Sequence, residues 1–166
     1  MDFGARLESA IRNLKSEMIY YGCDIPEDLL FDFERDLWVR FEDDGTATLG
    51  MTDTAQTRGG KLVNIVFKKV GKTLKQGQSV ATIESAKWVG PFPMPFSGEV
   101  VATNEETFRH DILIANRDPY GAGWLVKVRP TNLEAERGHL MGGADAVEKY
   151  KQRIVELNIK CYRCVD

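Results

Sequence analysis

The ten residues V-A-T-I-E-S-A-K-W-V, at positions 80–89, decide how the rest of this 166-residue chain is interpreted. The first four favour a β-strand, and the apolar pattern resumes at Trp88 and Val89. The small and polar residues between these flanks suit the tip of a hairpin. The stretch therefore predicts a strand, a tight turn and a second strand. Lys87 stands at the tip, where an enzyme can reach its amine.

An exposed lysine after a strand is usually only a solvated charge, so a modified lysine needs further motifs to support it. Three occur in order: E-S-A-K at 84–87, P-F-S-G-E-V-V at 95–101 and D-P-Y-G-A-G-W-L at 118–125. Over residues 34–157 the chain resembles the H protein of the glycine cleavage system and its lipoyl-carrier relatives. The resemblance implies lipoate in amide linkage to Lys87. It also implies that Glu84 and Ser85 set the geometry of the tip and are recognised by the lipoylating enzyme.

Within that family, the chain most resembles the lipoate-binding protein of sulfur-oxidising, heterodisulfide-reductase-like systems. The likeness lies in E-S-A-K-W-V-G-P at 84–91 and in the residues before Trp38. Glycine cleavage members commonly have His-Glu at the two places that Asp36 and Leu37 occupy here. We therefore expect the chemistry handled by the arm to differ from theirs.

The resemblance implies a mostly β fold, a flattened barrel-sandwich of the lipoyl/biotinyl-like hybrid kind. The expected domain division is 1–33 for an N-terminal helix and connector, 34–130 for the lipoyl-bearing domain, 131–158 for a C-terminal helical segment and 159–166 for a cysteine-containing tail. Local patterns predict the remaining elements. Strands are expected at 36–41, 46–50, 62–67, 97–105, 112–116 and 123–128, and helices at 3–21, 51–56 and 144–157.

The run Gly90–Pro95 contains three prolines, which remove three backbone donors, so it cannot be a central strand. We expect it to be stiff and extended. Trp88 and Phe92 either cover the sheet or contact the arm, and the sequence leaves both interpretations open.

Composition excludes several classes of function. The net charge of −3 and the absence of a basic block argue against a nucleic-acid partner, and no apolar run is long enough to span a membrane. The acidic, amphipathic N-terminal residues do not resemble a signal peptide, so a cytoplasmic location is expected. Three cysteines are an odd number that gives no disulfide framework, which fits a reducing compartment.

Cys161 and Cys164 form a C-x-x-C pair that glycine cleavage members lack. The pair could be a redox couple, a carrier of sulfur, or incidental, and it lies in a segment expected to be mobile. Binding of zinc within one chain would need two ligands in addition to Cys161 and Cys164. His110, expected in a loop before a strand, and His139 show no metal or triad spacing, so no catalytic or metal-binding residues are expected.

The function expected from these features is that of a non-catalytic lipoyl carrier whose arm moves a group or electrons between enzymes. The preferred cargo is sulfur, delivered to a heterodisulfide-reductase-like complex. The alternative is the aminomethyl group of glycine cleavage, with the cleavage enzymes and dihydrolipoyl dehydrogenase as partners. A lipoate ligase or lipoyl synthase system would attach the cofactor. An unlipoylated interaction module of the same fold and a dithiol oxidoreductase that uses Cys161 and Cys164 are further alternatives.

Overall fold

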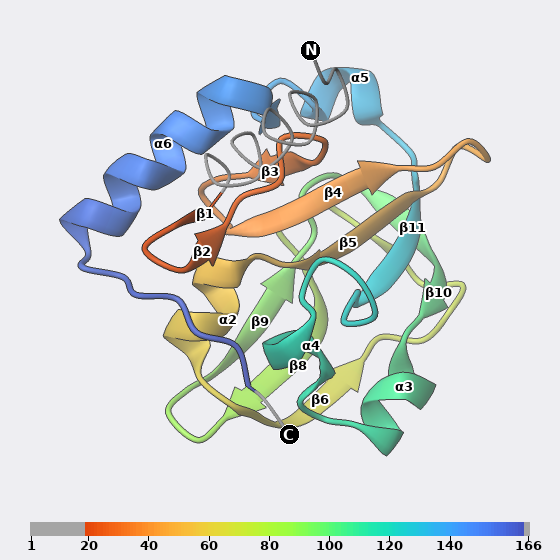
Figure 1. The fold of residues 1–166 in the computed structure, drawn as a ribbon. Helices are drawn as coiled ribbons and strands as arrows, with labels where there is room; N and C mark the ends of the chain where they lie inside the picture. The colour runs from red at the N-terminus through yellow and green to blue at the C-terminus, as the bar shows by residue number, and fades with distance from the viewer. Residues whose placement is uncertain (1–18, 165–166) are drawn as a thin grey trace, which may run out of the picture.

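A computed structural model describes residues 19–164 as a sandwich of two antiparallel sheets with short helices at its edges (Figure 1). The larger sheet has seven strands in the order β12-β3-β4-β5-β11-β10-β7, the smaller has three in the order β6-β8-β9, and β1 and β2 form a separate hairpin. The strands are β1 (Ile19–Tyr20), β2 (Cys23–Asp24), β3 (Leu30–Asp32), β4 (Leu37–Phe41), β5 (Ala47–Met51), β6 (Leu62–Phe67), β7 (Thr73–Leu74), β8 (Ser79–Ser85), β9 (Val89–Pro93), β10 (Gly98–Thr103), β11 (Val126–Pro130) and β12 (Met141–Gly142). The helices are α2 (Asp53–Gly59), α3 (Glu105–His110), α4 (Ile114–Arg117), α5 (Leu133–Glu136) and α6 (Gly143–Glu156).

The main core lies between the two sheets, because each sheet turns an apolar face inward. On β8 the side chains at 83 and 85 are buried while those at 82 and 84 are exposed, as the two-residue period of a strand requires. Aliphatic and aromatic side chains from both sheets meet in one cluster, which includes Val39, Leu49, Val80, Ile83, Phe92 and Phe96. The mostly β sandwich is confirmed, and the two sheets remain separate rather than closing into a barrel.

A second apolar cluster joins α6 to the β1–β2 hairpin and β3. Tyr150 and Ile154 on the inner face of α6 pack with Phe31, Trp38 and Cys23. The indole nitrogen of Trp38 donates to the carbonyl of residue 119 at 2.9 Å. The C-terminal helix is therefore as predicted, and this cluster attaches it to the sandwich.

Most local predictions are confirmed. The strands expected at 36–41, 46–50 and 62–67 are β4, β5 and β6, and the short helix after residue 51 is α2. The proline-rich run contributes β9, which pairs only with β8 and so lies at an edge of its sheet. At the β4–β5 turn, Arg40 and Thr48 donate to the carboxylate of Glu42, and these hydrogen bonds lower its pKa.

One prediction is wrong, and a second is wrong at its end. Residues 112–116 are not a strand, because 112 and 113 form a turn and 114–116 belong to α4, and His110 is the exposed last residue of α3. The helix predicted at 3–21 falls mostly outside the described residues, but its last three are not helical. Ile19–Tyr20 is β1, and Tyr21 and Gly22 form a turn with positive φ angles of 50° and 76°. Among residues 19–164, no helix has the length and apolar character needed to span a bilayer.

Candidate functional site

The tip of the β8–β9 hairpin is held by one serine. The Ser85 hydroxyl accepts hydrogen bonds from the backbone N–H groups of Lys87 (3.2 Å) and Trp88 (3.0 Å) and donates to the carbonyl of Gly59 at 2.5 Å. The Ser85 N–H donates to the Trp88 carbonyl at 2.7 Å, which closes the turn. The side chain therefore fixes the turn and ties it to the end of α2. Glu84, by contrast, points outward from β8 and is exposed.

Lys87 is exposed at this tip, and its Nζ has no hydrogen-bond or ion-pair partner among residues 19–164. Its aliphatic stem lies over Gly60, where an added Cβ would come 2.7 Å from the Lys87 Cε. Gly60 has a φ of 83°, which is costly for residues with a side chain, and its N–H donates to the carbonyl of Gln56 to end α2. Because Gly60 has no side chain, the aliphatic stem of Lys87 can pack directly against the backbone at this position.

Beside the tip lies a cleft of about 490 Å³, here called the tip cleft, which Lys87 itself lines. Part of its wall is apolar, formed by Ile83, Trp88 and Phe92 from the hairpin and by Met51. The Trp88 ring is 43% exposed and lies across Gly90. Trp88 and Phe92 therefore both cover the sheet and line the space next to Lys87.

The polar wall of the tip cleft is built around Asp36, a residue in the turn before β4 with a φ of 56°. Its carboxylate accepts hydrogen bonds from the hydroxyls of Thr52 (2.6 Å), Thr54 (2.9 Å) and Tyr150 (3.0 Å). Burial, followed by the charge of Asp36, raises the pKa of Tyr150 well above its usual value. The phenol therefore stays protonated and remains a donor. The half-buried carboxylate of Asp36 in the wall thus accepts hydrogen bonds from three hydroxyl groups.

Two arginines also line the tip cleft, and they differ in their contacts. Arg35 pairs with Asp32 at 2.8 Å. Arg58, in the last turn of α2, is exposed and has no ion-pair or hydrogen-bond partner within the described part of the chain. Arg58 is therefore the arginine of the cleft that remains available to a ligand.

Asn116 on α4 is a buried residue whose role sequence reasoning missed. Its Oδ1 accepts from the N–H of Leu62, and its Nδ2 donates to the carbonyl of Gly60 and to the side chain of Gln56. It therefore fastens the end of α2 to the start of β6. A lone asparagine beside a D-P-Y-G turn gives no local signal for this contact.

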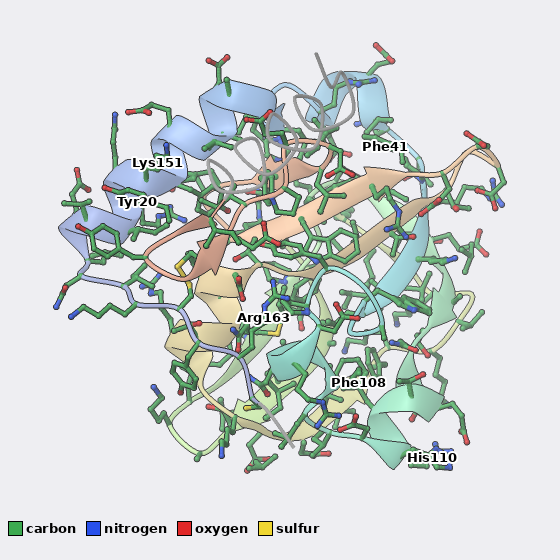
Figure 2. All side chains as sticks on the ribbon, viewed as in Figure 1. Tyr20, Phe41, Phe108, His110, Lys151 and Arg163 are labelled. Atoms are coloured by element: carbon green, nitrogen blue, oxygen red, sulfur yellow. A yellow bond between two sulfur atoms is a disulfide. The ribbon has the colours of Figure 1, made fainter. Side chains whose placement is uncertain are left out.

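The segment after α6 lies along α2. Cys161 forms a disulfide with Cys23 on β2, so the structure does not pair it with Cys164, which is a free thiol of intermediate exposure. The expectation that the cysteines form no disulfide is therefore corrected: Cys23 is far away in sequence but adjacent in space. Arg163, which Figure 2 labels, binds Asp53 at 3.2 Å and Asp24 at 3.6 Å. Within residues 19–164, no cluster of His, Cys, Asp and Glu is placed to hold a metal ion.

Comparison with known proteins identifies the family. A sequence model described as glycine cleavage H-protein matches residues 29–153, which include the hairpin, the tip cleft and most of α6. The chain belongs to the glycine cleavage H-protein family. Among its H-protein relatives, glycine cleavage system H protein 2 of Aquifex aeolicus is 46% identical over 142 residues, covering 86% of this chain and 88% of the relative. H protein 3 of the same organism is 45% identical over 157 residues, covering 93% of this chain and 97% of the relative. The crystal structure of an H protein from Mycobacterium marinum matches with a TM-score of 0.64 at 31% identity, covering 76% of this chain and 98% of that one.

Proposed function

We propose that this chain is a lipoyl carrier, with lipoate joined by an amide bond to Lys87. The observation that carries the proposal is the free, exposed Lys87 amine on a turn fixed by Ser85, directly beside a cleft with an apolar wall. Membership of the glycine cleavage H-protein family supports it. A bound lipoyl group supplies a dithiolane that accepts a group or electrons by thiol–disulfide chemistry.

The residues around the tip suit such a group. Gly60 leaves room for the lysine stem, while Ile83, Trp88 and Phe92 offer apolar surface to a hydrocarbon chain. Acylation removes the charge of Lys87, so the stem gains no ion pair that would hold it in one place. The protein's task is to present and shelter this arm, and it needs no catalytic residue of its own.

We propose the aminomethyl group of glycine cleavage as the cargo. The relatives named as glycine cleavage H proteins support this choice. Asp36 adds a physical reason, because an ionised carboxylate in the cleft wall would favour a cargo that carries a protonated amine. The partners would then be the glycine cleavage enzymes and dihydrolipoyl dehydrogenase, with a lipoate ligase or lipoyl synthase system to attach the cofactor.

A second candidate cargo is sulfur, moved to a heterodisulfide-reductase-like complex. Arg58 favours it, because an unpaired guanidinium in the same cleft would attract an anionic sulfur group rather than an ammonium. The absence of the His-Glu pair that glycine cleavage members commonly have at these positions, 36 and 37, is a departure that also favours it.

Mass spectrometry of the protein from its native host tests the carrier proposal. We expect a lipoyl adduct on Lys87, and its absence from a Lys87→Arg variant expressed in the same cells. An unmodified Lys87 in cells whose other lipoyl proteins are modified would refute the carrier and favour an interaction module.

The cargo is tested by reconstitution of the lipoylated protein with glycine cleavage enzymes, using one variant for each charge in the cleft. An aminomethyl cargo predicts that Asp36→Asn lowers turnover while Arg58→Gln leaves it unchanged. Failure of the lipoylated wild-type protein to support glycine cleavage would favour the sulfur cargo instead.

A further inference from the structure

All three cysteines lie outside residues 29–153, the part of the chain that matches the H-protein family. Cys23 precedes this region and Cys161 follows it, yet the disulfide brings them together across a sequence separation of 138 residues. The bond therefore joins two segments that flank the carrier unit. Residues 159–164, here called the strap, are held at this point against the body of the protein.

The strap lies on one face of α2. The side chains of Gln56 and Thr57 donate to the Tyr162 carbonyl, the first at 2.8 Å, and Arg163 pairs with Asp53. Beyond α2, the Cys164 N–H donates to the Asn116 carbonyl at 3.0 Å. In a helix that turns about 100° per residue, positions 53, 56 and 57 lie within about 50° of a common direction and so share one face.

The opposite face of α2 forms part of the tip cleft. Its residues there are Ala55, Arg58 and Gly59, which by the same geometry point about 180° away from the strap. Gly59 accepts the hydrogen bond from Ser85 that holds the Lys87 turn. Helix α2 is thus held between the strap on one face and the tip on the other.

The disulfide is open to attack on one side. Cys23 is fully buried, whereas Cys161 has intermediate exposure in a surface segment. Of the two residues, Cys161 is therefore the more accessible to an incoming thiolate, and attack on its sulfur would make Cys23 the leaving thiol. This asymmetry differs from a disulfide buried at both ends, which no external thiol can reach.

We propose that the Cys23–Cys161 disulfide is a thiol–disulfide exchange site whose substrate is a dithiol, and that its reduction releases the strap from α2. One thiolate of the dithiol attacks the Cys161 sulfur, the Cys23–Cys161 bond breaks, and Cys23 leaves and takes up a proton. The second thiol then attacks the mixed disulfide, which releases Cys161 as a thiol. The dithiol is oxidised to a cyclic disulfide, and two electrons and two protons pass to the protein.

Apart from the disulfide, the contacts of the strap are non-covalent. They are hydrogen bonds, the Arg163 ion pairs and the buried side chain of Ile159, which belongs to the second apolar cluster. Reduction removes the covalent constraint at Cys161, and we expect residues 161–164, which are bonded to α2 by hydrogen bonds and ion pairs, to leave it.

Cys164 cannot replace Cys23 as the disulfide partner of Cys161 while the strap is docked. Residues 161–164 run without helix or turn, so three residue steps of about 3.3 Å place their Cα atoms roughly 10 Å apart if extended. A disulfide needs a Cα separation below about 7 Å. Substitution of Cys164 is therefore a matched control that leaves the exchange site intact.

The test uses the full chain without lipoate and free dihydrolipoamide as the dithiol, so its result does not depend on whether Lys87 carries a lipoyl group. Native protein is incubated with increasing ratios of dihydrolipoamide to lipoamide and alkylated, and its mass is measured. We expect free thiols to rise from one to three per chain without denaturant, and from zero to two in Cys164→Ser. If the disulfide is reduced only in denaturant, the proposed exchange is refuted.

Release of the strap is measured by hydrogen exchange on the same samples. Reduction should speed exchange of the Cys161 and Cys164 amides by at least about tenfold, because both donate hydrogen bonds only while the strap is docked. Unchanged protection after complete reduction would refute release. The same thiol count is then made with lipoylated, reduced protein as the electron donor and unlipoylated Lys87→Arg protein as the acceptor. It shows whether a dithiol bound to a second protein molecule can replace free dihydrolipoamide.

Discussion

Removing the Cys23–Cys161 disulfide should lower the stability of the fold by a calculable amount. The bond closes a loop with a sequence separation of 138 residues. The chain-entropy relation gives an entropy change of about 17 cal/mol/K for such a loop, or about 5 kcal/mol at 25 °C. Measured losses fall at or below this ceiling, so we expect about 3–5 kcal/mol, which corresponds to a fall in Tm of roughly 6–20 °C for a chain of this size.

The comparison should be made in a Cys164→Ser background, so that no other disulfide can form. Urea denaturation of Cys164→Ser and of Cys161→Ser/Cys164→Ser, without reductant, gives the two free energies of unfolding. Adding a reductant should bring the single variant close to the double variant and leave the double variant unchanged. A difference below about 0.5 kcal/mol would refute the reasoning, since it is within the range of an ordinary surface substitution.

Three further outcomes follow from contacts around the tip cleft and the β4–β5 turn, each measured as a urea-unfolding free energy. Tyr150→Phe removes a buried hydroxyl that donates to the charged Asp36 and should cost about 2 kcal/mol; a loss below about 0.5 kcal/mol would contradict this role. Gly60→Ala should cost about 1–2 kcal/mol because of its positive φ, while Gly59→Ala, whose Cβ meets nothing within 4 Å, should change stability by less than about 0.5 kcal/mol; equal losses would refute the distinction. The lowered pKa of Glu42 means that its hydrogen bonds stabilise the fold above the ordinary pKa of 4.5 and stop doing so as pH falls through the lowered folded-state value. The deficit of Glu42→Gln, a few tenths of a kcal/mol at pH 7, should therefore disappear in acid, and a deficit that grows in acid would reverse the assigned sign.

The parts of the fold that local patterns determine were predictable. The hairpin around Lys87 and strand β6 follow from short apolar runs bounded by turn residues, and both lie where the sequence indicates. The proline-rich run was correctly excluded from the centre of a sheet, because missing N–H donors act locally.

The features that depend on distant contacts were not predictable. Residues 112–116 have the composition of a strand but form a turn and the start of α4, where Asn116 is buried against the end of α2. The pairing of Cys23 with Cys161 depends on the direction that the chain takes after the end of α6, and no rule of cysteine spacing predicts that direction. The C-x-x-C spacing suggested Cys164 as the partner of Cys161, but in an extended strap the two Cα atoms are too far apart for a disulfide.

Strand β9 lies at an edge of its sheet, beside Lys87, to which we propose that lipoate is attached. Such an edge would normally offer a row of N–H groups on which a strand from another copy of the chain could form. Pro91 and Pro93 carry no N–H, so they remove two of the donors that this pairing would use. In the proposed carrier, which several enzymes would approach in turn, the tip thus stays accessible while its edge strand is a poor site for self-association.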